Sequence, residues 1–187
     1  MIEIKKLTPD LIDQFTSYFE NIEYEHAPNW KSCYCHYYHS NCSFDEWKTR
    51  TSEDNKLASI QAIYDGMMTG FLAFRENKCI GWVNINNAKS YQRLEEELKP
   101  YIGSKKVALS ICFVIHPDFR GQGIARAILD HAIDFYRYQG YDGMIALPII
   151  GDFKKELHYR GTMNMYSERG YEEIGQEGQT KILYKKL

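Results

Sequence analysis

Hydrophobic and polar positions follow two different periods along this chain, and the periods predict alternating strands and helices. Alternation over residues 2–7 predicts a short first strand, and apolar residues at steps of one and three over residues 11–22 predict an amphipathic helix. A capping box formed by Ser43 and Glu46 predicts the start of one or two further helices that run to residue 65.

The central and C-terminal parts of the chain are rich in strand patterns. A nearly continuous apolar run over residues 107–115 is typical of a central strand that is covered on both faces. Shorter strands, including two hairpins, are predicted at residues 71–74, 79–85, 144–147, 171–174 and 182–184. Further helices are predicted at residues 124–136 and 157–169, with a short acidic helical piece that ends at Pro100.

Composition and charge narrow the classes of protein to which the chain can belong. The 23 basic and 25 acidic residues give a formal charge of −2, which argues against a nucleic-acid partner. No apolar stretch approaches the roughly 18 residues of a membrane span, and residues 1–6 lack the apolar core of a signal peptide, so we expect a cytoplasmic protein without membrane contact. The five cysteines are expected to be reduced. Because no repeat or linker is visible, we expect one domain over residues 1–187.

Two glycines connect the predicted central strand to the helix that follows it. Gly121 and Gly123 have no Cβ to keep an anion from the backbone, and Arg120 and Arg126 add positive charge on either side. A helix that begins at such a turn offers unpaired N–H groups and the positive end of its dipole, which suits a diphosphate. Glycines that only allow a strand to turn into a helix are the alternative interpretation. No Gly-Lys-Ser/Thr occurs and the third glycine of dinucleotide-binding loops is missing, which excludes both of those phosphate-binding classes.

The glycine turn and a second segment together resemble a known family. Residues 115–125, IHPDFRGQGIA, are similar to the acyl-CoA signature of the GNAT superfamily of N-acyltransferases, Arg/Gln-x-x-Gly-x-Gly/Ala, with Arg120, Gly123 and Ala125 in the three fixed positions. Residues 166–171, YSERGY, are similar to the Tyr-x-x-x-Gly-Phe at the end of the family's last helix. The order of elements fits the family along the whole chain. The resemblance implies an α/β fold with a mixed, twisted, splayed sheet of about six to seven strands flanked by helices.

The resemblance also implies where acetyl-CoA binds. Pantetheine would lie in the cleft beside the central strand and hydrogen-bond to the backbone of Phe113, Val114 and Ile115. The pyrophosphate would bind at the turn, at Arg120, Gly121, Gln122, Gly123, Ile124, Ala125 and Arg126. An apolar strand that leads into a helix N-terminus agrees with this, because it offers main-chain partners to amides and then donors to phosphate.

The implied reaction is direct attack of a primary amine on the thioester, without a covalent enzyme intermediate. The protein must align two substrates, stabilise an oxyanion and protonate a departing thiolate. Tyr166 matches the position of the family's acid, and a phenol with a reference pKa of about 10 is protonated at neutral pH. A tyrosine that only packs in the core is the alternative interpretation.

Two positions depart from the family pattern. Tyr159 stands where an asparagine often contacts pantetheine, and residues 107–115 lack the glutamate that many relatives use as the base. We interpret His116 as a solvated or structural histidine, and Cys112 as a small buried hydrophobe rather than a nucleophile. The remaining candidates for the base are water, Glu25, His26 and the acidic run Glu95, Glu96 and Glu97.

Residues 24–42 have no hydrophobic period and are rich in Tyr, His and Cys. Loops of this length in compact domains are usually functional or disordered. Five Cys or His residues fall between residues 33 and 42, but structural zinc usually takes two separated pairs of ligands, so we expect no metal. We expect the aromatic rings either to wall the acceptor side of the cleft, where they could hold an amine by cation–π contact, or to anchor the loop in the core. These residues are Trp30, Tyr34, Tyr37 and Tyr38.

The leading hypothesis is therefore an acetyl-CoA-dependent N-acetyltransferase that acts on a small-molecule amine. Acetylation of protein amines is one alternative. A non-catalytic module that binds acyl-CoA as a sensor is another, because the strand lacks the glutamate. Dimers are common among relatives, so a homodimer is compatible with the resemblance, but the sequence locates no interface.

Overall fold

The computed structural model of the chain describes residues 1–23, 28–151 and 158–187. The described residues form seven strands, β1 Glu3–Lys6, β2 Gly70–Arg75, β3 Lys78–Asn87, β4 Val107–Ile115, β5 Gly143–Ala146, β6 Glu172–Glu177 and β7 Thr180–Lys186. They also form the α-helices α1 Ile12–Asn21, α2 Phe44–Thr49, α3 Ser52–Tyr64, α4 Glu95–Ile102, α5 Ile124–Tyr138 and α6 Met163–Ser167. Among these residues, no helix has the length and apolar character needed to cross a membrane.

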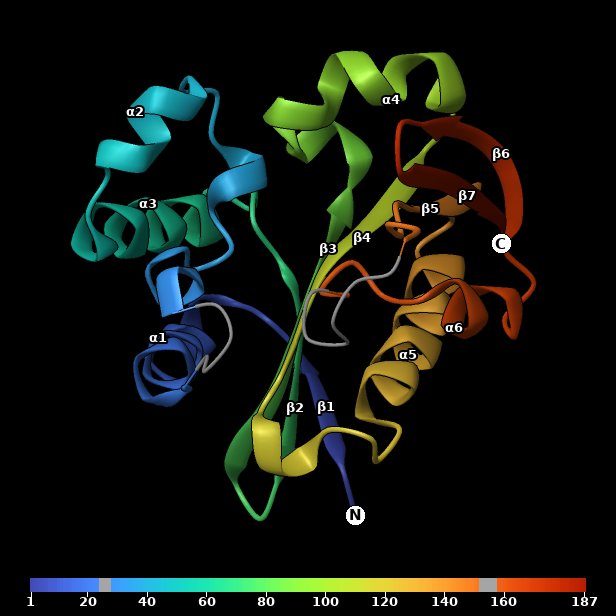
Figure 1. Cartoon of the computed structure of the whole chain (residues 1–187). Coiled ribbons are helices and arrows are strands. Elements are labelled where there is room, and N and C mark those ends of the chain that lie inside the picture. Colours follow the sequence, from blue (N-terminus) through green and yellow to red (C-terminus); the bar gives the residue numbers. More distant parts are fainter. Residues whose placement is uncertain (24–27, 152–157) are drawn as a thin grey trace.

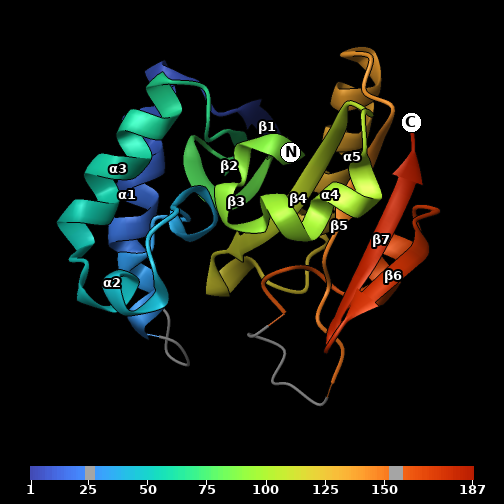
Figure 2. The ribbon, with the colours of Figure 1, turned by 90° about the horizontal axis from the view of Figure 1, so that it is seen from above.

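The strands form one mixed sheet, and helices cover both of its faces. The strand order is β1-β2-β3-β4-β5-β7-β6, and β4 and β5 run parallel while the other neighbours are antiparallel. Figures 1 and 2 both place α1 and α3 on one side of the central strands and α5 on the other. The predicted α/β fold with a mixed sheet of six to seven strands is confirmed.

Alternation along the central strands divides the core into layers. Phe71 and Ala73 of β2 pack in the cluster that contains α5, whereas Leu72 and Phe74 pack in the cluster that contains α1. Successive side chains of a strand point to opposite faces, so a sheet that is covered on both sides needs apolar residues at consecutive positions. The same requirement explains why the predicted run at residues 107–115 is nearly continuous.

The short strand β5 pairs with only the first half of β4, and the sheet opens where this pairing ends. Pairing between β4 and β5 begins at Val107 with Gly143 and ends at Ser110 with Ala146. On the other side of β4, Ser110 pairs with Ile85 and Cys112 pairs with Asn84, so the residue between them is a β-bulge. Bulges increase local twist. Beyond this point β4 continues beside β3 alone, and its other edge faces a cleft.

Helix boundaries differ from the sequence predictions at two places. The acidic helix α4 does not end at Pro100 but continues to Ile102, because a proline at this position removes one intrahelical hydrogen bond without unwinding the last turn. The last helix was expected at residues 157–169 and is shorter, since Thr162 caps its start by accepting a hydrogen bond from the Met165 amide. The first part of that prediction, residue 157, lies outside the described residues.

Two buried tyrosines allow the packing of α5 on the sheet to be tested. The Tyr136 hydroxyl donates a 2.9 Å hydrogen bond to the Ile85 carbonyl beside the bulge, whereas the buried Tyr171 hydroxyl has no partner among the described residues. We expect Tyr136→Phe to lower the free energy of unfolding by about 1–2 kcal/mol, because a buried carbonyl loses its donor. Tyr171→Phe is the matched control and should leave the free energy of unfolding unchanged or raise it, because it removes a buried hydroxyl that has no partner among the described residues. Urea denaturation measures both, and equal losses would contradict the role given to the Tyr136 bond.

Candidate active site

A cleft of about 410 Å³ lies where β4 has separated from β5. It extends from the start of α5 to the segment that precedes α6. Its lining is formed by Trp30, Phe113, Val114, Ile115, Arg120, Gly121, Ala125, Arg126, His158, Tyr159, Gly161, Thr162 and Met165. Seven of the ten residues predicted to bind the cofactor are in this lining.

The remaining three predicted residues, Gln122, Gly123 and Ile124, do not line the cleft. Gln122 donates from Nε2 to the Asp118 carbonyl, 3.0 Å away, and its side chain lies on the exposed side of the turn. Ile124 is buried in the core cluster of α5. Gly123 is the N-cap of α5, so its effect is on the backbone conformation of the turn rather than on the cleft wall.

The turn before α5 has the shape that an anion needs. Gly121 and Gly123 have positive φ angles of 72° and 79°, and a Cβ at either position would meet no atom within 4 Å. Residues with a Cβ rarely adopt this backbone conformation. Because glycine has no side chain, the backbone N–H groups at the start of the helix stay open to a ligand. Arg126, which lines the cleft, donates to the Glu168 carboxylate at 2.9 and 3.1 Å.

The chain itself occupies part of the strand edge on which pantetheine was expected. The Phe113 amide donates a 2.6 Å hydrogen bond to the Tyr159 carbonyl, and Arg120 donates from Nε to the Ile115 carbonyl at 3.1 Å. The segment around Tyr159 therefore crosses the open edge of β4. Binding of pantetheine at Phe113, Val114 and Ile115 stays a prediction.

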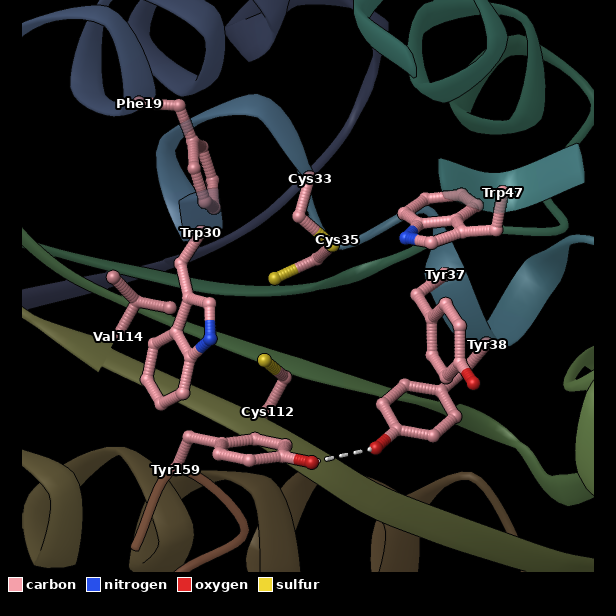
Figure 3. A pocket seen from close by; sticks show the side chains of 10 residues that line it. All are labelled: Phe19, Trp30, Cys33, Cys35, Tyr37, Tyr38, Trp47, Cys112, Val114 and Tyr159. Atoms are coloured by element: carbon pink, nitrogen blue, oxygen red, sulfur yellow. Dashed lines mark hydrogen bonds between the residues drawn. The ribbon is translucent and has the colours of Figure 1, made fainter. Parts of the chain in front are cut away.

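A second, largely aromatic cavity of about 230 Å³ lies on the other side of β4 from the glycine turn that precedes α5. Its lining consists of Phe19, Trp30, Cys33, Cys35, Tyr37, Tyr38, Trp47, Cys112, Val114 and Tyr159. Figure 3 places the rings of Trp30, Tyr38 and Tyr159 around the sulfur atom of Cys112. The segment without hydrophobic period thus contributes much of this wall, in 3₁₀ turns at Pro28–Ser32 and Tyr37–His39.

Three of the four predicted aromatic residues, Trp30, Tyr37 and Tyr38, line this cavity. Tyr34 does not, because its ring packs in the core against Phe19, with 5.5 Å between ring centroids. Sequence reasoning did not identify Phe19 of α1 and Trp47 of α2 as parts of this wall. Their apolar periodicity could not distinguish a cavity wall from ordinary packing.

Burial favours the uncharged forms of two thiols and two imidazole rings at or near the aromatic cavity. Burial raises the pKa of Cys33 to about 12 and raises that of Cys35 well above its usual value. Burial lowers the pKa of His36 and of His39 to about 4, so both rings are neutral at pH 7. In the part of the chain that the structure describes, no three Cys, His, Asp or Glu residues are arranged to hold a metal ion.

Among the described residues, none of the side chains considered as the base lines either cavity. Glu25 and His26 lie outside the described residues. Glu95, Glu96 and Glu97 are on α4 and belong to neither lining. His116 is also outside both linings, and its Nδ1 accepts from the Asp118 amide at 3.4 Å.

Tyr166 lies in the core next to the cleft. Its side chain is fully buried, and its hydroxyl donates to the Arg160 carbonyl at 2.8 Å and lies 3.2 Å from Ser110 Oγ. Burial raises its pKa above the usual value of a phenol. A Cβ on Gly161 would lie 2.9 Å from this hydroxyl, so the segment before α6 packs directly over it. Tyr166 is in neither lining, and its role as the acid stays a prediction.

Similar folds occur among solved structures of acetyltransferases. A GNAT-family acetyltransferase from Streptococcus pneumoniae is 15% identical, with 100% of this chain and 99% of that chain covered and a TM-score of 0.58. The PaiA N-acetyltransferase from Thermoplasma acidophilum, solved in complex with coenzyme A, is 17% identical with 100% and 99% covered and a TM-score of 0.57. The polyamine N-acetyltransferase of Drosophila melanogaster is 11% identical, with both chains fully covered and a TM-score of 0.60. At these identities the likeness establishes the fold.

A comparison at the level of sequence identifies the family of the chain. No curated protein sequence matches this chain, but the sequence profile of the Acetyltransferase (GNAT) family matches residues 17–171, which is most of its length. The matched region contains the aromatic cavity wall, the central strand, the glycine turn and Tyr166. With a splayed mixed sheet and a glycine turn at the start of α5, the chain belongs to the GNAT family, the acetyl-CoA-dependent N-acetyltransferases.

Proposed function

We propose that this protein transfers the acetyl group of acetyl-CoA directly to the primary amine of a small molecule bound in the aromatic cavity. The observation that carries the proposal is that the cleft and the aromatic cavity share Trp30, Val114 and Tyr159. A donor in the cleft and an acceptor in the cavity would therefore meet at one place. Holding two reactants in the right geometry removes a large part of the barrier to a direct transfer.

Acetyl-CoA fits the cleft on the geometry of this chain. The open turn at Gly121 offers backbone donors and the positive end of a 15-residue helix to a pyrophosphate. The apolar residues of β4 then lead from the turn to the shared wall at Val114. A structural neighbour from Thermoplasma acidophilum was solved with coenzyme A, which supports the same use of the cleft here.

The chemistry of the aromatic cavity favours an amine attached to an apolar or aromatic group. Its described lining contains aromatic, aliphatic and thiol side chains and no carboxylate. Apolar surroundings disfavour the charged ammonium form of an amine, so they favour the free amine, which is the nucleophile. Aromatic rings also supply flat apolar contact. The Drosophila neighbour is named for polyamines, so polyamines are the informative comparison.

A panel of amines tests this function. Purified protein is mixed with acetyl-CoA and 2-phenylethylamine, tryptamine, spermidine or a peptide with a free N-terminus, and free thiol is followed. We expect kcat/KM for an arylalkylamine to exceed that for spermidine by about tenfold or more, which corresponds to about 1.4 kcal/mol of apolar contact. A peptide that reacts best would favour acetylation of protein amines instead. Coenzyme A binding without thiol release from any amine would favour a sensor module.

The glycine turn can be tested separately by binding. Gly121→Ala should weaken coenzyme A binding by about tenfold or more, because the new Cβ enters the space that the pyrophosphate would occupy. Gly140→Ala is the matched control, since Gly140 at the end of α5 also has a positive φ, 68°, and open space around a Cβ. Both variants carry the same backbone strain, so only the first should change the dissociation constant measured by calorimetry. If the two variants bind coenzyme A equally well, the turn is not part of the coenzyme A site.

A further inference from the structure

One ionisable side chain stands where the two cavities meet. Of the three residues shared by their described linings, Val114 is aliphatic and Trp30 has only a weakly acidic indole N–H. Tyr159 is the third, and its ring packs edge-on against Trp30 with 5.0 Å between centroids. A reacting thioester that spans the junction would therefore lie against the Tyr159 phenol.

Hydrogen bonds behind the ring fix the direction in which Tyr159 can donate. Arg160 donates from Nε and Nη2 to the Tyr38 hydroxyl at 3.1 and 2.9 Å. An arginine only donates, so these two bonds use the acceptor capacity of the Tyr38 oxygen. Tyr38 must then give its own proton to the Tyr159 oxygen, 3.0 Å away, as the dashed line in Figure 3 marks. Tyr159 is the acceptor in this hydrogen bond, so its own hydroxyl proton is available to a ligand.

The same hydrogen bonds prepare the Tyr159 oxygen to carry negative charge. The Arg160 guanidinium lies 5.8 Å from the centre of the Tyr159 ring and is held in place by Tyr38 and by Thr180. Burial raises the pKa of Tyr38 well above its usual value, so Tyr38 keeps the proton that it shares with Tyr159. A phenolate formed at Tyr159 would thus keep a hydrogen-bond donor and a nearby positive charge.

We infer that Tyr159 is a catalytic residue that gives its proton to the departing sulfur of coenzyme A, with Tyr38 and Arg160 as positioning residues. The inference rests on the proposed function. The amine nitrogen bonds to the carbonyl carbon, the carbon–sulfur bond breaks with its electron pair on sulfur, and the Tyr159 proton moves to that sulfur. The surplus proton of the nitrogen passes to solvent, and a solvent proton restores the phenol. The net products are an amide and a free thiol.

Tyr166 is the competing donor. Its proton is already used in the bond to the Arg160 carbonyl, and it lines neither cavity. Tyr159, by contrast, is partly exposed and lines both. Arg160 lines neither cavity but contacts Tyr38. Besides Tyr38, the charged or titratable side chains in the two described linings are Cys33, Cys35, Tyr37, Cys112, Arg120, Arg126 and His158. The pH dependence below therefore has to be assigned by substitution at Tyr159 itself.

The experiment measures kcat, KM and their pH profiles for acetyl-CoA with the best amine of the panel, or for acetyl-CoA hydrolysis if no amine reacts. Tyr159→Phe should lower kcat by about 100-fold, with KM for acetyl-CoA within about twofold, and should remove the fall of kcat at alkaline pH. Tyr38→Phe should lower kcat by about tenfold and move that fall to higher pH, because the phenolate loses a donor. Tyr171→Phe is the control that leaves kcat unchanged.

Fluorinated tyrosine gives a second measurement that does not remove the hydroxyl. Its phenol is more acidic, so incorporation at position 159 should move the alkaline fall of kcat to lower pH, and incorporation at position 166 should leave it in place. Full turnover by a folded Tyr159→Phe protein, or a response to fluorination only at position 166, would overturn the inference and leave the proposed function standing. A wild-type protein that releases no thiol from acetyl-CoA would overturn both.

Discussion

The site depends on the point where β4 and β5 stop pairing. Four residue pairs join the two strands, and the bulge in β4 beside Ser110 then turns β4 away with β3. If β4 and β5 stayed paired along all of β4, the hydrogen bonds between them would close the cleft. Because the sheet opens, one stretch of β4 has an edge that pairs with no other strand, and β4 has a cleft on one side and an aromatic cavity on the other. The apolar core beneath α5 and α1 holds this open arrangement in place.

Residues from distant parts of the sequence build the wall between the two cavities. Trp30 comes from the segment after α1, Val114 from the central strand, and Tyr159 from the segment before α6. The position of each of these residues, taken alone, is explained by ordinary packing. In the proposed reaction, these three residues bring the donor substrate, the acceptor and the Tyr159 phenol together at one place. The hydrogen bonds from Arg160 to Tyr38 and between Tyr38 and Tyr159 then orient the Tyr159 hydroxyl.

Much of the fold and the glycine turn before α5 could be predicted from the sequence, because local patterns determine them. The continuous apolar run at residues 107–115, and the glycines that follow it, specify a covered strand and an open helix start without long-range information. The acceptor side could not be predicted to the same extent. Tyr34 and Tyr37 look alike in sequence, yet one packs in the core and the other lines the cavity. Tyr159 was noted only as a departure from the family pattern, since its bond to Tyr38 joins residues 121 positions apart.

The bond between the Phe113 amide and the Tyr159 carbonyl has a consequence beyond catalysis. An open strand edge exposes amide and carbonyl groups that invite pairing with another chain, which is a common route to aggregation. Here the backbone of the protein's own downstream segment covers that edge at Phe113, and Arg120 covers the Ile115 carbonyl. The free protein can thus keep its sheet parted for a ligand and still shield the parted strand from edge-to-edge association.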